Sequence, residues 1–171
     1  VAAWVQIDSA GTRFEATVRS SAREELEAFL GTSFEAAPEA AWQLQEIAAG
    51  LAHVEAATSA EFLPHILNYQ ATGRINFNKG CYSGQEVVAR MHYRGKTKRR
   101  VYRARINSAQ APLAGSAVVS AEDNKVIGSV VNAAADNNRV ELLAVLPIDV
   151  VETEATLQLA GNGGENGRAP A

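Results

Sequence analysis

Residues 101–106 read Val-Tyr-Arg-Ala-Arg-Ile, and this alternating run indicates the fold class of the second half of the chain. Tyr102, Ala104 and Ile106 would occupy one face of a strand, with the two arginines on the other face, as in a half-buried strand. Further strand-like runs follow at Ala117–Ser120, Val126–Val131, Val140–Leu146 and Glu154–Leu159. Short strands at this spacing predict a small antiparallel β-barrel or sandwich.

The first half of the chain mixes strand and helix patterns. Ala3–Ile7 and Thr12–Val18 predict a hairpin around a turn that ends at Gly11. Two helices are expected next, one over residues 20–30 with Ser20 or Ser21 as its cap, and one over residues 38–49. Each expected helix is followed by a glycine, which is a common helix stop.

A third helix is expected where Ser83-Gly-Gln-Glu86 forms a capping-box pattern. It would run from Gly84 to about Tyr93. After Gly95 the sequence shows only strand-like patterns. The fold class is therefore α+β, with one domain over residues 1–95 and a barrel over residues 96–160. The glycine-rich tail at residues 161–171 is expected to be disordered because it has few apolar side chains to bury.

The composition is that of an ordinary globular protein, with 171 residues, 47% hydrophobic and 20% charged. The sequence contains no apolar run near the roughly 20 residues that a membrane span needs, so no membrane association is expected. The single cysteine, Cys81, cannot form an intramolecular disulfide, which favours the reducing cytoplasm. The chain begins at Val1 rather than Met, so we expect a fragment or a processed form, and we expect a monomer.

Positive charge is concentrated in one stretch. Lys79–Arg105 contains nine bases and one acid, Glu86, which gives a net charge of +8, while the remainder of the chain carries −11. Such a stretch is either a solvated face or a binding surface for phosphate, polycarboxylate or nucleic acid. The candidate surface consists of Arg90, Arg94, Lys96, Lys98, Arg99, Arg100 and Arg103.

Cys81 lies between two glycines just before the expected third helix. A helix N-terminus and nearby cations favour the thiolate, so this setting predicts a reactive thiol at Cys81. The alternative is a small buried hydrophobic side chain. Because His53, His65 and His92 are scattered and there is no second cysteine, we expect no closed metal site and no evident catalytic triad.

The octapeptide Lys79-Gly-Cys-Tyr-Ser-Gly-Gln-Glu86, followed by Tyr93-Arg-Gly-Lys96, closely resembles the signature of the YgfZ proteins. These proteins are folate-binding relatives of the glycine-cleavage aminomethyltransferase. The resemblance extends over about residues 1–160 and corresponds to the second half of such a protein. The residues of the octapeptide that it implies as a ligand loop are Lys79, Gly80, Cys81, Tyr82, Gly84, Gln85 and Glu86.

The resemblance implies the second half of an aminomethyltransferase-like folate-binding domain followed by the small barrel. It implies a tetrahydrofolate-type cofactor, a role in iron–sulfur cluster assembly or repair, and thereby a role in tRNA modification. The implied partners are folate, the iron–sulfur enzymes that modify tRNA, and tRNA itself. Cys81 would serve redox or one-carbon chemistry, although the residues reveal no complete catalytic constellation, so we expect an accessory protein rather than an enzyme.

Trp42 matches a family tryptophan at the folate site, where an indole offers a flat face to a pterin ring. Many relatives carry a glutamate where this chain has Ala48, so Glu46 and Glu55 are the candidate replacements.

Two other functions stay open. An aminomethyltransferase would not need the cysteine octapeptide. An RNA-binding module would explain the charge, but Tyr82, Tyr93 and Tyr102 are the only candidates for an exposed aromatic ladder.

Overall fold

The structure, a computed structural model, describes residues 3–160 and 166–167 and divides into two compact units, Val1–Pro38 and Glu39–Ala171. The first unit opens with the antiparallel hairpin of β1 (Ala3–Gln6) and β2 (Phe14–Thr17), which confirms the predicted hairpin. The Asp8 carboxylate accepts hydrogen bonds from the backbone N–H groups of Thr12 (3.0 Å) and Arg13 (3.1 Å) and thereby closes the turn.

The predicted serine cap of the next helix is wrong. Ser20–Ala22 form a short 3-10 turn, η1, and α1 (Arg23–Leu30) begins only after it, without a side-chain cap. The N-cap position is occupied by Ala22, whose side chain has no acceptor, so neither serine stands where it could cap the helix. The helix does end where the sequence predicts, with Gly31 at its C-cap.

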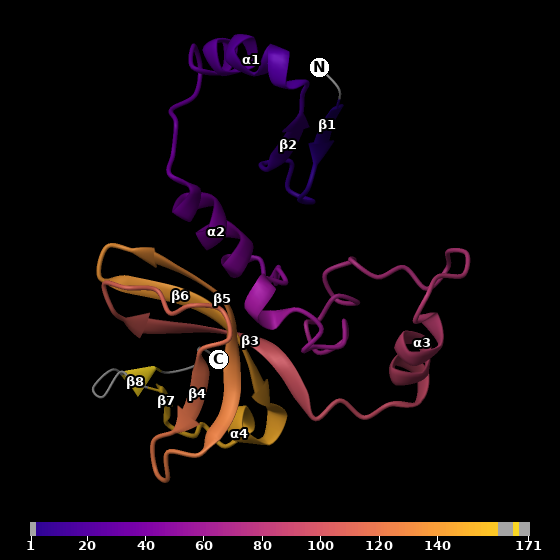
Figure 1. The fold of residues 1–171 in the computed structure, drawn as a ribbon, viewed down its shortest axis with the longest axis vertical. Coiled ribbons are helices and arrows are strands. Elements are labelled where there is room, and N and C mark those ends of the chain that lie inside the picture. The colour runs from indigo at the N-terminus through magenta and orange to yellow at the C-terminus, as the bar shows by residue number, and fades with distance from the viewer. Residues whose placement is uncertain (1–2, 161–165, 168–171) are drawn as a thin grey trace. The chain divides into compact units, whose positions relative to one another are not determined.

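The second unit contains one antiparallel sheet that curls into a half-barrel (Figure 1), in agreement with the predicted α+β class and with the strand direction of the expected barrel. The strand order is β3-β6-β5-β4-β7-β8. The bounds are β3 (Arg99–Asn107), β4 (Ala117–Ser120), β5 (Val126–Asp136), β6 (Arg139–Pro147), β7 (Leu157–Leu159) and β8 (Asn166–Gly167).

β6 is the most deeply buried strand because both of its faces are covered. Val140–Leu146 are all buried, which explains why this run is apolar throughout apart from Glu141 instead of alternating. One face packs with Val131 and Ile47 in a core under α2 (Glu39–Ala48), and the other with Val118 and Val130 inside the half-barrel. The predicted helix over residues 38–49 is therefore confirmed, and its apolar face lies on the sheet.

The segment between α2 and β3 is mostly irregular. It contains η2 (Ala56–Thr58), a run of turns, and α3 (Gln85–Arg94), which confirms the third predicted helix. The turns are tied to β3, because the Val101 N–H donates to the Ile66 carbonyl (2.8 Å) and the Asn68 amide donates to the Val101 carbonyl (3.0 Å). β3 therefore pairs within the sheet and also anchors the turns that precede α3.

A short helix, α4 (Ile148–Glu152), connects β6 to β7. The tail expected to be disordered, residues 161–171, lies outside the described residues except for β8, which pairs with β7. The expected domain boundary at residues 95–96 stays a prediction. Within the described residues, every helix is too short or too polar to cross a membrane.

Candidate functional site

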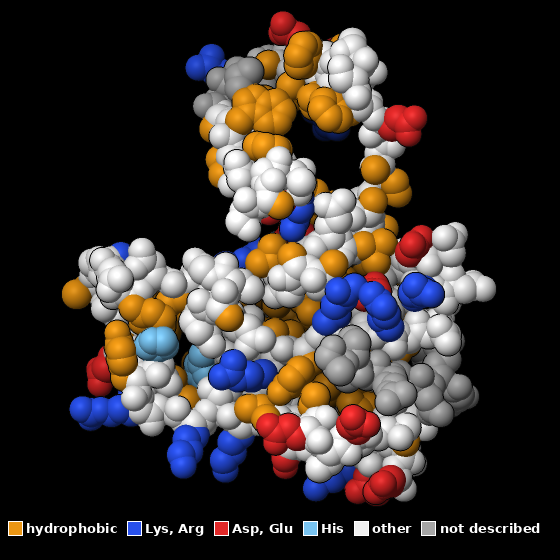
Figure 2. All heavy atoms as spheres, turned by 180° about the vertical axis from the view of Figure 1, so that it is seen from behind, with side chains coloured by type: hydrophobic (Ala, Val, Ile, Leu, Met, Phe, Trp, Pro, Cys, Tyr) orange, Lys and Arg blue, Asp and Glu red, His pale blue; other side chains and the backbone are white. Residues whose placement is uncertain are grey.

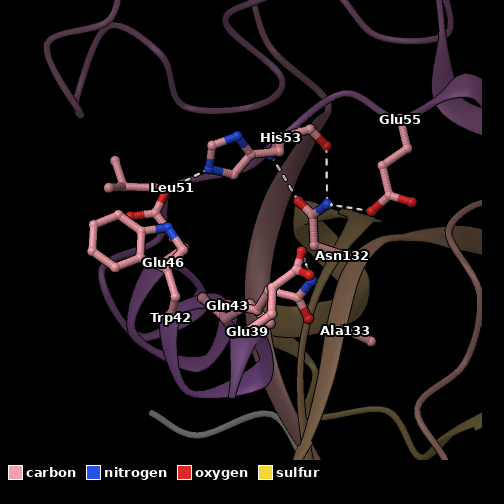
Figure 3. A pocket seen from close by; sticks show the side chains of 10 residues that line it. Glu39, Trp42, Gln43, Glu46, Leu51, His53, Glu55, Asn132 and Ala133 are labelled. Atoms are coloured by element: carbon pink, nitrogen blue, oxygen red, sulfur yellow. Dashed lines mark hydrogen bonds and ion pairs between the residues drawn. The ribbon is translucent and has the colours of Figure 1, made fainter. Parts of the chain in front are cut away.

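One face of α2 borders a cavity of about 260 Å³ (Figure 3). Trp42 and Glu46 stand one helical turn apart, so both side chains lie on this face. The segment after the helix and strand β5 supply the other walls. The lining residues are Glu39, Trp42, Gln43, Glu46, Ile47, Leu51, His53, Glu55, Asn132 and Ala133. The cavity thus combines one half-buried indole with three carboxylates.

Glu46 is a buried carboxylate that is held by His53 and Arg74. Only 6% of the residue is exposed, and its Oε2 contacts His53 Nε2 and lies 3.7 Å from Arg74 Nη2. A buried charge is costly unless it is paired, so this arrangement stabilises the ionised carboxylate at the cavity wall. Arg74 is held in turn by a hydrogen bond from Nη1 to the Ala52 carbonyl (3.0 Å).

Asn132 connects the segment after α2 to the sheet. Its Oδ1 accepts a hydrogen bond from the His53 N–H (2.7 Å), and its Nδ2 donates to the His53 carbonyl (3.0 Å) and to Glu55 Oε1 (2.8 Å). It stands at an irregularity in the β5–β6 register, between Val130 and Asn132, where a bulge redirects side chains. The amide therefore positions both His53 and Glu55 at the cavity (Figure 3).

Glu46 and Glu55, the two expected replacements for a family glutamate, both line the cavity with Trp42. Ala48 is exposed and does not line it, because two residues along a helix turn the side chain about 200° away from the face of Glu46. The alanine at position 48 therefore removes no carboxylate from the lining of this cavity.

The octapeptide lies elsewhere, in an exposed loop that leads into α3. Cys81 is a free, exposed thiol, and no octapeptide residue lines the cavity of Trp42. Exposure contradicts the alternative of a buried hydrophobic cysteine. The Trp42 indole and the Cys81 thiol therefore do not line the same cavity.

The predicted capping box before α3 is wrong. The N-cap is Gly84, at φ +86°, with no side-chain cap, and the Gln85 side chain instead accepts a hydrogen bond from the Tyr82 N–H (3.3 Å). The left-handed conformation that suits glycine places Ser83 outside the helix, so its hydroxyl does not cap it. Cys81 precedes the first helical residue, Gln85, by four positions. Lys79 Nζ lies 4.7 Å from the centre of the Tyr82 ring.

A second cavity of about 140 Å³ lies beneath α3. It is lined by His65, Gln70, Ile75, Phe77, Val88, Met91, His92, Gly95, Thr97 and Arg100. His65 is 7% exposed, and burial together with the nearby Arg100 charge lowers its pKa below the usual 6.5. His65 is therefore neutral near pH 7.

The basic stretch divides into two groups. Arg103 and Arg105 both form ion pairs with Glu141 of β6, so Arg103 is engaged within the sheet rather than available on the expected surface. The other bases of the expected surface form no ion pair among the described residues, and Arg99 donates only to the Ile127 carbonyl (2.9 Å). Most of the positive charge therefore stays accessible.

Sequence reasoning missed His53, Arg74 and Asn132. His53 was noted only as one of three scattered histidines, and its contact with Asn132 joins residues 79 positions apart. No local pattern signals such a contact, because it depends on the packing of α2 and β5.

No protein-family model matches this chain. The chain is similar to the tRNA-modifying protein YgfZ of Yersinia pestis (strain Pestoides F), with 47% identity over 74 residues, which is 43% of the chain and 22% of the relative. It is also similar to the tRNA-modifying protein YgfZ of Photobacterium profundum, with 39% identity over 115 residues, or 65% of the chain and 35% of the relative. The chain thus spans about a third or less of the length of these relatives. These matches support a partial region of a YgfZ family member.

Proposed function

We propose that this chain forms one wall of a folate site in a protein that acts in iron–sulfur cluster maintenance and thereby in tRNA modification. The observation that carries the folate proposal is the single cavity that contains Trp42, Glu46 and Glu55. A pterin ring is flat and bears amino and ring N–H donors. An indole face and carboxylate acceptors therefore suit it in both shape and hydrogen bonding.

The size of the cavity favours one ring system rather than a whole folate. Ligand pockets commonly measure about 300–1,000 Å³, and this one measures about 260 Å³. The rest of the ligand would extend out of it. The proposal that the fold derives from an aminomethyltransferase-like domain is consistent with this arrangement, because a larger domain would cover the remainder.

The residues of this chain would bind and orient the ring. Trp42 would stack on it, and Glu55, positioned by Asn132, would accept a hydrogen bond from a ring donor. His53 and Arg74 would orient Glu46 and keep it ionised. A bound tetrahydrofolate would supply one-carbon chemistry.

The role in tRNA modification is supported by the names of the relatives, which are described as tRNA-modifying proteins. The iron–sulfur enzymes that modify tRNA are the proposed partners, and exposed Cys81 is accessible to them for redox or one-carbon chemistry. The proposed location is the cytoplasm.

Titration of the full-length protein with tetrahydrofolate, with every tryptophan except Trp42 replaced by phenylalanine, tests the folate proposal. Binding should quench the indole fluorescence. Glu55→Gln keeps an oxygen for Asn132 but removes the charge, and should weaken binding roughly tenfold or more. Glu61→Gln, an exposed glutamate outside the cavity, is the matched control. No quenching and no heat of binding in the otherwise unaltered protein would remove the proposal.

A further inference from the structure

Three aromatic rings meet where the loop before the octapeptide contacts α3. The Phe77 and His92 rings are stacked, with centroids 4.0 Å apart and planes inclined by 22°. Tyr93 meets both rings edge-on, at 6.2 Å from Phe77 and 4.8 Å from His92. Phe77 comes from the loop before the octapeptide and the other two come from α3, so the cluster forms only in the folded structure.

Two of the three rings are exposed to solvent, and Phe77 is half-buried. Tyr93 is 71% exposed, and His92 is also exposed. When a flat group packs against a large exposed ring, apolar surface of both is removed from water, and this lowers the free energy. The cluster therefore offers a stacking surface rather than a completed core.

Three cations lie on or directly after the helix that carries His92 and Tyr93. Arg90 and Arg94 share α3 with His92 and Tyr93, and Lys96 follows directly. All three are exposed and form no ion pair among the described residues, in contrast to Arg103 and Arg105. On the face drawn in Figure 2, Lys and Arg side chains lie along the lower edge of the part that carries α3, below histidine and hydrophobic side chains.

From this juxtaposition we infer that the Phe77–His92–Tyr93 cluster and the cations of α3 form a binding surface for unpaired RNA nucleotides. A base stacks on the exposed Tyr93 ring, and Arg90, Arg94 and Lys96 contact the adjoining phosphates. Stacking on aromatic rings combined with a positively charged surface is how proteins bind single strands. An acidic peptide would use the cations but not the rings, and paired bases in a duplex would not reach them.

The choice of RNA rests on the proposed role in tRNA modification, while the surface itself is separate from the folate cavity. None of the three aromatic residues lines that cavity. Binding of RNA and binding of folate can therefore be measured independently, and the failure of one leaves the other standing.

The test measures fluorescence anisotropy of a labelled single-stranded RNA, and of a duplex of the same sequence, with the folate-free full-length protein. The single strand should bind more tightly. Tyr93→Ala should weaken its binding roughly five- to one-hundredfold, the effect of losing one stacked base, whereas Tyr93→Phe should retain it. Tyr93 lies on an exposed helical surface, where alanine is well tolerated.

Charge removal gives a second, independent readout. The triple variant Arg90→Gln, Arg94→Gln and Lys96→Gln should lower the slope of log affinity against log salt by about 2, since each phosphate contact contributes about 0.7 for a single strand. The control removes two exposed cations of the half-barrel, by Lys125→Gln and Arg139→Gln, and should leave the slope unchanged.

Three results would overturn the inference. One is the absence of single-strand binding at low salt. Another is equal binding of the duplex with no effect of Tyr93→Ala. The third is competition by polyglutamate as effective, charge for charge, as that by RNA, which would identify the surface as a site for acidic proteins.

Discussion

Arg103 of β3 donates a hydrogen bond of 2.8 Å from its Nε to the Glu141 carboxylate of β6. Arg105, directly opposite Glu141 in the strand register, donates to the other carboxylate oxygen. Glu141 is 8% exposed and is the single charge within the buried run Val140–Leu146. Two arginines of the basic stretch are therefore structural and hold the sheet together.

Replacing Glu141 with glutamine should destabilise the chain. The change keeps the volume but replaces the charged acceptor of two guanidinium groups, and hydrogen bonds to charged groups contribute about 1.5–3 kcal/mol. Urea denaturation followed by circular dichroism should show a loss of that size. Glu122→Gln, in an exposed turn, should change the free energy of unfolding by less than about 0.5 kcal/mol. Equal effects of the two variants would contradict the structural role of Glu141.

Acid should weaken the same contact. Burial alone would raise the pKa of Glu141, but the hydrogen bonds and charges of Arg103 and Arg105 outweigh burial and hold the pKa below its usual 4.5. The unfolded chain therefore binds a proton before the folded chain does, so this stabilisation is present above about pH 4.5 and is lost as the pH falls through the folded pKa. The difference in stability between the natural chain and Glu141→Gln should shrink over that range, and a constant difference would count against the ion pair.

Titration of His65 should make the free energy of unfolding depend on pH in a higher pH range than Glu141 does. Burial, and next the Arg100 charge, lower its pKa, so between pH 6.5 and the folded pKa the unfolded chain holds more protons on this group. Its contribution to stability is complete above pH 6.5 and falls as the pH decreases. His65→Phe cannot titrate, and it removes a buried Nδ1 that has no hydrogen-bond partner among the residues that the structure describes. Denaturation between pH 5 and 7 should show a flatter profile for this variant, and an unchanged profile would refute the assignment.

Gly128 should not tolerate a side chain. A Cβ at this position of β5 would lie 2.3 Å from the Val145 carbonyl oxygen and 2.6 Å from a Leu146 methyl group, so the central strands would have to separate. Gly128→Ala should cost about 1–3 kcal/mol, as overpacking does. Gly80→Ala is the control, because nothing lies within 4 Å of its Cβ and its backbone is not left-handed. A neutral Gly128→Ala in thermal unfolding would show that β5 and β6 are farther apart than described.

Cys81 should matter for function and not for folding. The thiol is exposed, so Cys81→Ala should leave the free energy of unfolding within about 0.5 kcal/mol of the original. In cells that depend on the full-length protein, the same variant should lower the fraction of tRNA that carries iron–sulfur-dependent methylthiolation. Ser83→Ala, also exposed, is the matched control for this loop. Equal tRNA modification with Cys81→Ala and Ser83→Ala would argue against the proposed role of the thiol.

The sequence predicted elements far better than it predicted caps and contacts. The alternating run before Ile106, the hairpin around Asp8 and the helix that contains Trp42 were all predicted correctly, because each depends on the periodicity of a few neighbouring residues. Both predicted serine caps were wrong. A cap depends on the backbone angles at one position, such as the left-handed Gly84, which a local pattern does not specify.

By itself, the sequence determined the α+β class, the octapeptide that relates the chain to YgfZ proteins, and the concentration of positive charge between Lys79 and Arg105. Only the tertiary structure decided which of those charges are available for binding, since Glu141 of β6 forms ion pairs with Arg103 and Arg105 of β3. It also brought Asn132 to His53, and Phe77 to His92, in contacts between residues far apart in the chain. Periodicity reflects local backbone geometry, whereas burial and pairing depend on which distant surfaces exclude water from one another.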